Sequence, residues 1–167
     1  MSETDTDGGP DVDAMRRLWW LHDARWYQAV MARFGQDVAN ELNAQAMRFV
    51  ARRVAIDHAV PCAGGAGEVA AELDRLLGVM FADMVKAETT VLDDTTMETV
   101  VTDHFALRML RATRSLAGYR CPCLDLRGGW FEGMGVPADD EVVECQRDGA
   151  SACRFRACLS PTTPGEA

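Results

Sequence analysis

Five of the six cysteines lie in the last third of the chain. Cys121 and Cys123 form a C-P-C step, and Cys145 and Cys153 lie on the two arms of a predicted hairpin, E-V-V-E-C-Q-R-D-G-A-S-A-C-R-F. Zinc binds cysteine sulfur in closed structural sites with four ligands, and these four thiolates can converge on one tetrahedral ion. The spacing therefore favours a metal site, with apolar packing of buried cysteines or a disulfide as the alternatives.

The other two cysteines fit this site less well. Cys158 follows Cys153 by an odd offset, so on a regular strand it faces the other side of the sheet, and we predict that it is not a ligand. Cys62 lies alone in the Gly-rich stretch Pro61 to Gly67, which we interpret as a linker. The pattern predicts zinc as the cofactor, and an iron–sulfur cluster is the alternative that cysteine spacing leaves open.

A second group of chemically active residues lies near the N-terminus. His22, Asp23, Trp26 and Tyr27 form i, i+4 pairs on neighbouring helical turns, where they could line a pocket; a wide core face with a solvated carboxylate is the alternative. His104 lies where a predicted strand meets a predicted helix, and its neutral ring could accept a proton or bind a metal. If the chain is an enzyme, His22, Asp23 and His104 are the predicted catalytic residues.

Composition narrows the class of partner. The chain has 167 residues, a formal net charge of -9 and a pI near 4.7, which argues against nucleic acid and against an anionic membrane surface. No apolar run approaches the roughly 20 residues of a membrane helix, and the acidic N-terminus is unlike a secretory signal. We predict a cytoplasmic protein that binds a small molecule, with Trp26, Tyr27 and Trp130 as ligand-binding residues; a homodimer is left open.

The periodicity of apolar residues predicts an α+β fold. Helical spacing predicts five helices, at about 11–34, 36–58, 69–86, 105–116 and 121–134. In the first, Asp11 or Asp13 supplies the N-cap and Gly35 the stop; the last is expected to break at Gly128-Gly129. Alternation predicts an antiparallel hairpin or bulged strand pair, 88–92 with 97–102, and a closing hairpin, 142–146 with 153–159. We expect one domain at 11–159, with disordered tails at 1–10 and 160–167.

The closing pattern, together with Cys121 and the segment G-G-W-F-E-G at 128–133, resembles the 4-vinyl reductase-type domain. That domain type also serves as the sensor of bacterial activators that respond to phenol and toluene derivatives. The resemblance implies an antiparallel sheet packed with helices, and a zinc site beside the ligand pocket that uses Cys145, Cys153 and either Cys121 or Cys123. The sensors carry a glutamate where this chain has Val142, and the second cysteine of C-P-C could replace it.

The N-terminal half carries a second resemblance. L-W-W-L-H-D-A-R-W-Y-Q-A-V-M-A-R-F-G, at 18–35, followed by A-N-E-L-N at 39–43, resembles small bacterial proteins related to L-2-amino-thiazoline-4-carboxylic acid hydrolases. Two hypotheses follow. The chain is a zinc-stabilised module that binds a small apolar or aromatic ligand, because a closed thiolate site has no open coordination position. Alternatively, it is a small hydrolase-like enzyme acting on a C=N or amide bond. The sequence contains no G-x-S-x-G or H-E-x-x-H motif and no nucleotide fingerprint.

Overall fold

A four-stranded antiparallel sheet and five α-helices form the molecule, as described by a computed structural model of residues 11–60 and 65–160. The predicted α+β class is confirmed. The strands are β1 (Val85–Val91), β2 (Thr96–His104), β3 (Ala138–Glu144) and β4 (Cys153–Leu159), in the order β1-β2-β4-β3. Cys62 and the predicted tails lie outside the described residues, except Ser160, whose backbone N–H donates to the Pro137 carbonyl.

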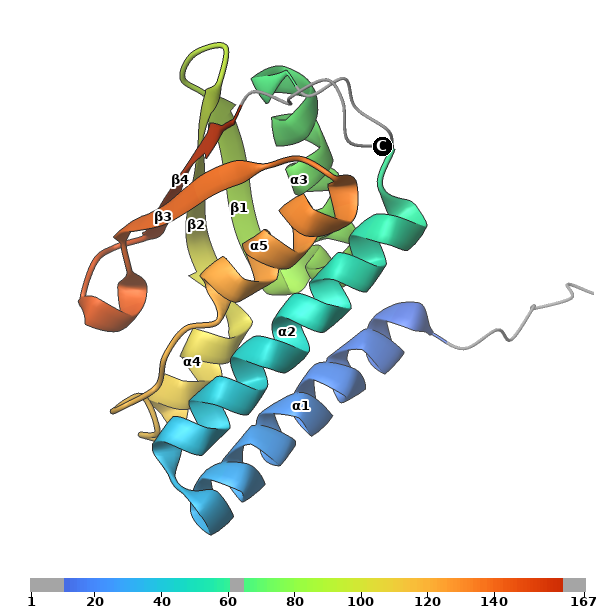
Figure 1. The fold of residues 1–167 in the computed structure, drawn as a ribbon. Helices are drawn as coiled ribbons and strands as arrows, with labels where there is room; N and C mark the ends of the chain where they lie inside the picture. Colours follow the sequence, from blue (N-terminus) through green and yellow to red (C-terminus); the bar gives the residue numbers. More distant parts are fainter. Residues whose placement is uncertain (1–10, 61–64, 161–167) are drawn as a thin grey trace, which may run out of the picture.

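Two long antiparallel helices, α1 (Val12–Phe34) and α2 (Gln36–His58), lie side by side across one face of the molecule (Figure 1). The Asp11 carboxylate accepts hydrogen bonds from the backbone N–H groups of Asp13 and Ala14, which confirms the predicted N-cap. Gly35 separates the helices with φ at 91°, a conformation that an L-residue rarely adopts. The predicted bounds of both helices are therefore confirmed.

The third and fourth helices end earlier than the sequence predicts. Helix α3 (Ala66–Phe81) ends where Ala82 takes φ 46°, and a short 3-10 turn, η1 (Ala82–Met84), leads directly into β1. Helix α4 (Phe105–Ala112) ends where the Thr113 hydroxyl donates to the Met109 carbonyl, and Arg114 follows with φ 53°. A side chain that bonds back to the helix and a left-handed residue after it both stop helical propagation.

Both predicted strand pairs are present, but the first strand of the closing hairpin is Ala138–Glu144 rather than 142–146, because the chain turns into a 3-10 helix at Gln146. β1 and β2 form an antiparallel hairpin whose register shifts between Lys86 and Ala87, so the pair is also bulged. β3 and β4 form the closing hairpin, and its turn contains the 3-10 helix η2 (Gln146–Asp148) and Gly149 at φ 99°. Along β4, Cys153 is buried and Cys158 is exposed, as their odd spacing predicts.

Helix α5 (Cys123–Met134) is continuous through Gly128 and Gly129, so the predicted break is wrong. The glycines serve close packing against α2. A Cβ on Gly129 would lie 2.3 Å from the Arg48 carbonyl oxygen, and one on Gly133 would lie 2.5 Å from the Arg52 carbonyl oxygen. Residues of this size let two helix backbones approach closely, and the close approach outweighs the weak helix propensity of glycine.

The core consists of two apolar clusters. One packs α2, α3 and α5 against the sheet through residues such as Leu73, Leu76, Met97 and Trp130. The other, which includes Tyr27, Leu107, Tyr119 and Phe155, joins α1 and α4 to the end of the sheet that carries the cysteines. No helix in the described part of the chain is long and apolar enough to cross a membrane.

Candidate functional site

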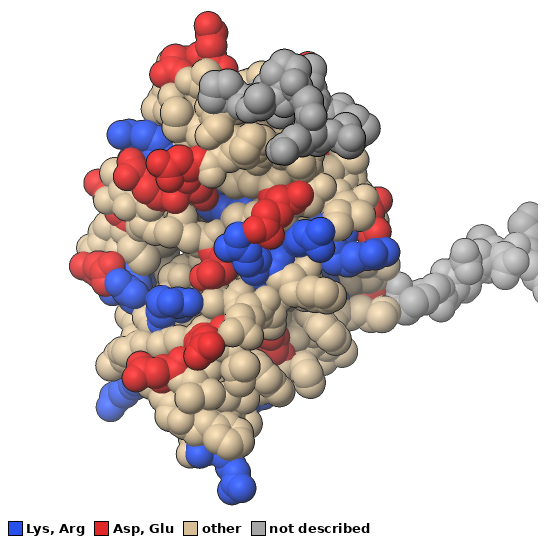
Figure 2. Space-filling view, viewed as in Figure 1, with Lys and Arg blue, Asp and Glu red and all other residues tan. Residues whose placement is uncertain are grey.

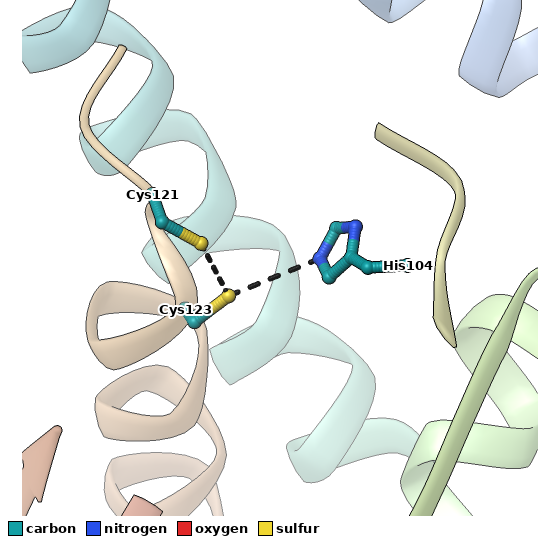
Figure 3. A group of neighbouring side chains, drawn as sticks. All are labelled: His104, Cys121 and Cys123. Carbon is teal, nitrogen blue, oxygen red and sulfur yellow. Dashed lines mark hydrogen bonds between the residues drawn. The ribbon is translucent and has the colours of Figure 1, made fainter. Parts of the chain in front are cut away.

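Cys121 and Cys123 lie where a loop enters the first turn of α5, and their thiols point toward each other (Figure 3). Their sulfur atoms are 2.6 Å apart, which is longer than the roughly 2.05 Å of a disulfide bond. Pro122 holds the step between them, because its fixed φ suits the residue that precedes a helix. The local sequence thus presents two thiols to the same point.

The two hairpin cysteines form a second pair of thiols. Cys145 follows the end of β3 and Cys153 begins β4, and their sulfur atoms are 3.9 Å apart. Two thiolates on a tetrahedral zinc ion with bonds of about 2.3 Å are about 3.8 Å apart, so this pair already has the spacing of two zinc ligands. The Gln146 backbone N–H donates to the Cys153 sulfur at 3.2 Å, a bond that stabilises negative charge on it.

The two pairs of thiols influence one another's protonation. The hydrogen bond from Cys123 lowers the pKa of Cys121, and the nearby Arg147 guanidinium acts in the same direction. The hydrogen bond with Cys121, burial and the nearby thiols of Cys153 and Cys145 raise the pKa of Cys123 well above its usual value. Burial also raises the pKa of Cys153 to about 12. Both Cys123 and Cys153 are therefore neutral thiols at pH 7.

His104, the last residue of β2, faces the first pair of thiols (Figure 3). Its Nε2 lies 3.9 Å from the Cys123 sulfur, and His104, Cys121 and Cys123 can together offer ligand atoms within 4.8 Å of one another. Its Nδ1 is buried and has no hydrogen-bond partner in the described part of the chain. Burial lowers the pKa of His104 to about 4, so the ring is neutral at pH 7.

A cavity of about 130 Å³ lies between the five helices and the sheet, with His104 and Cys123 in its wall. Its walls are mostly aromatic and aliphatic, and include Phe81, Trp130 and Phe155. Only a few polar side chains line the cavity. A pocket with apolar walls and few polar groups is the usual form of a small-molecule site.

The structure brings some of the predicted site residues to this cavity and leaves others outside. Asp23 and Tyr27 line it with His104 and Trp130. His22 is exposed and stacks on Trp19, with ring centroids 5.7 Å apart. Trp26 is exposed too, and neither His22 nor Trp26 is among the described residues that line the cavity.

Two tyrosines and Asp23 form the polar end of the cavity. Burial raises the pKa of Asp23 and also that of Tyr119, which packs edge-on against Tyr27. The Tyr27 hydroxyl donates to Asn40 at 2.8 Å, and the Asn40 amide donates to the Gly118 carbonyl. Sequence reasoning missed Tyr119 and Asn40, because their roles depend on contacts between residues about 80 positions apart.

Arg127 is the most heavily bonded polar residue in the cavity wall. It donates to both Asp140 carboxylate oxygens, at 2.6 and 2.9 Å, and to the Thr99 hydroxyl at 2.8 Å. Its guanidinium also lies over the rings of Phe131 and Phe155. The only sequence signal for this role is one arginine on an otherwise apolar helix face. The ion pair joins α5 to β3, and this positions the wall of the cavity.

The fold is similar to two solved structures. One is the phenol-responsive sensory domain of the transcription activator PoxR with phenol, at 15% identity and a TM-score of 0.58, covering 81% of this chain and 72% of that chain. The other is a trafficking protein particle complex subunit 3 from Naegleria fowleri covalently bound to palmitic acid, at 12% identity and a TM-score of 0.53, covering 83% of this chain and 93% of that chain. No family model and no curated protein matches the chain.

Proposed function

We propose that the chain is a small-molecule-binding domain whose ligand is a small, mainly aromatic molecule with one polar group. The observation that carries this proposal is the cavity of about 130 Å³ with aromatic walls, one of whose lining residues, His104, has a buried Nδ1 without a partner in the described part of the chain. An engineered protein cavity of roughly 150 Å³ binds benzene, so the volume suits a single ring. The PoxR sensory domain, which has a similar fold, is described with phenol, and the trafficking subunit with palmitic acid.

The cavity residues divide between packing and hydrogen bonding. Phe81, Trp130 and Phe155 contact the ring, because stacked and edge-on arrangements of aromatic groups add to the free energy of burial. The His104 Nδ1 forms a hydrogen bond with the polar group, since a buried nitrogen without a partner costs about 1–3 kcal/mol that the ligand removes. Tyr119 lies in the same wall and restricts the position of the ring.

We propose further that Cys121, Cys123, Cys145 and Cys153 hold a structural zinc ion beside this cavity. The 3.9 Å spacing of the hairpin thiols fits two zinc ligands, whereas the 2.6 Å between Cys121 and Cys123 must widen by about 1 Å to reach tetrahedral spacing. A bound zinc would fix the closing hairpin to the start of α5. His104 then remains free to meet the ligand rather than the metal.

Titration with phenol and toluene, followed by tryptophan fluorescence or calorimetry, tests the ligand. We expect both to bind, and phenol more tightly. His104→Ala should weaken phenol binding about 10-fold, the value of one buried hydrogen bond, and leave toluene binding unchanged. His58→Ala, at an exposed position, is the control. The absence of saturable binding in metal-loaded protein, or equal loss of both ligands in His104→Ala, contradicts the proposal.

Metal content, measured on purified variants by elemental analysis, tests the zinc ligands separately. Cys145→Ser and Cys153→Ser should lose zinc and several kcal/mol of stability, while Cys158→Ser and His104→Ala should retain one zinc per chain. Loss of zinc in His104→Ala would instead assign the metal to the set His104, Cys121 and Cys123. A brown protein that absorbs near 400 nm would indicate an iron–sulfur cluster.

A further inference from the structure

Helix α1 exposes an apolar stripe that the core does not use. Val12, Met15, Trp19 and Trp26 follow one another at spacings of three, four and seven residues, and all four are exposed. Residues at these spacings lie on one face of a helix. The stripe is exposed only as far as Trp26, because Val30, one turn further along the same face, is buried together with Tyr27. The part of this stripe from Val12 to Trp26 is not covered by the described part of the chain.

Helix α2 repeats this arrangement. Its buried side, which includes Met47, Ala51 and Ala55, packs within the molecule. A second apolar stripe consists of Val38, Leu42, Phe49 and Ile56, again at spacings of four and seven, and all four are exposed. On a helix of 3.6 residues per turn, Phe49 lies nearly opposite Ala44 and Ala51. This stripe therefore points away from α5 and the sheet.

The exposed area is large enough for a specific interface. Trp19 is 63% exposed, Trp26 40% and Phe49 70%. Because a whole aromatic side chain has an area of about 200 Å², these three side chains together expose roughly 350 Å² of apolar surface. The aliphatic residues of both stripes bring the total to roughly 700 Å², against about 800 Å² per partner in a stable complex. Figure 2 shows largely neutral surface over the lower halves of the two helices and a band of charged side chains across the upper half of α2. Patches of this size mark interaction sites.

The charges along α2 favour a second copy as the occupant. Asp37 and Glu41 are exposed in its N-terminal half. Arg48, Arg52 and Arg53 are exposed in its C-terminal half, where Arg53 pairs with Asp57 and Arg48 with Glu132 of α5, so that half keeps a small net positive charge. When two such helices pack antiparallel and cross near the middle, the acidic half of each lies beside the basic half of the other. The apolar residues also match in this arrangement. Leu42 of one helix lies beside Phe49 of the other, as an isologous two-fold interface requires.

We propose that the outer face of α1 and α2 binds the same face of a second copy of this chain, with the two α2 helices antiparallel and crossing near Gln45. The four helices then form an antiparallel bundle with an apolar centre. The exposed tryptophans of α1, which lie outside the ligand cavity, become core residues of the dimer. His22, which stacks on Trp19, belongs to this interface. The cavity and the thiol cluster lie on the other side of these helices. Ligand binding and metal binding can therefore be measured independently of the dimer.

The mass of the chain in solution tests the dimer. Light scattering or sedimentation from about 1 to 100 μM, a range that spans micromolar dissociation constants, should give twice 18.3 kDa. Phe49→Glu should raise the dissociation constant at least about 100-fold, since it buries two unpaired charges in a two-fold interface. Leu92→Glu, at a position 51% exposed in the β1–β2 turn, is the matched control and should remain a dimer.

A cross-link tests the arrangement independently of mass. Gln45→Cys should form a disulfide-linked dimer under mild oxidation, because the two copies of this residue meet at the crossing point. Glu88→Cys, exposed on β1, should not. Circular dichroism of each variant establishes that it is folded. A monomeric parent at the highest concentration, a Phe49→Glu variant that still dimerises, or cross-linking at Glu88→Cys rather than Gln45→Cys would each overturn the proposal.

Discussion

Replacing Gly129 with alanine tests whether close contact between α2 and α5 positions the site. The added Cβ would lie 2.3 Å from the Arg48 carbonyl oxygen and 3.0 Å from the Ala51 Cβ. The nearest atom belongs to helix backbone and cannot rotate away, so α2 and α5 must separate by about 1 Å to reach ordinary contact distances. Overpacking of this kind lowers the free energy of unfolding by about 1–3 kcal/mol. The better helix propensity of alanine offsets up to about 1 kcal/mol of this loss.

The expected net loss for Gly129→Ala is therefore about 1–2 kcal/mol, or about 3–6 °C in Tm for a chain of this length. Gly78→Ala is the matched control. Gly78 lies inside α3 with no atom within 4 Å of an added Cβ, so alanine there should stabilise the protein by about 0.5–1 kcal/mol. Urea or thermal unfolding of both variants measures the difference. Equal stability of Gly129→Ala and Gly78→Ala would refute the argument from close packing.

Two further substitutions probe the surroundings of the cavity, and a third tests an exposed cysteine. Arg127→Met leaves the Asp140 carboxylate buried without its partner and should cost about 3–5 kcal/mol in urea unfolding; a loss below about 1 kcal/mol would show that the ion pair contributes little. Asn40→Ala leaves the Gly118 carbonyl without its amide donor and should cost about 1–3 kcal/mol in the same assay. Cys158→Ser changes an exposed side chain, so its stability should stay within about 0.5 kcal/mol of the parent.

Elements with local signals could be predicted from the sequence. Asp11 and Gly35 mark the ends of α1 through capping and a left-handed turn, which depend only on neighbouring residues. The β-branched alternation of 88–92 and 97–102 likewise identifies a strand pair. The hairpin spacing of Cys145 and Cys153 predicts that the two thiols are neighbours, because the register of a hairpin follows from its turn, whereas the site of four cysteines stays a prediction.

Features that depend on distant contacts could not be predicted. Gly128-Gly129 has the composition of a helix break, and only the position of α2 explains why the helix continues there. Trp26 and Tyr27 are neighbours with similar composition and opposite environments, since Tyr27 is buried and Trp26 faces outward. The exposed Trp26 and the buried Val30 lie one turn apart on the same stripe of α1, so helical spacing alone does not indicate which apolar residues meet the core.

Helix α5 connects the thiol cluster to the cavity, and this connection explains why the two features occur together. Cys123 belongs to both, since its sulfur faces His104 and its side chain lines the cavity. One turn later Arg127 fixes the helix to β3 through Asp140, and Trp130 then closes the cavity wall. The ion pair between Arg127 and Asp140 limits rotation of the helix. The cavity walls that α5 supplies therefore keep their positions relative to His104.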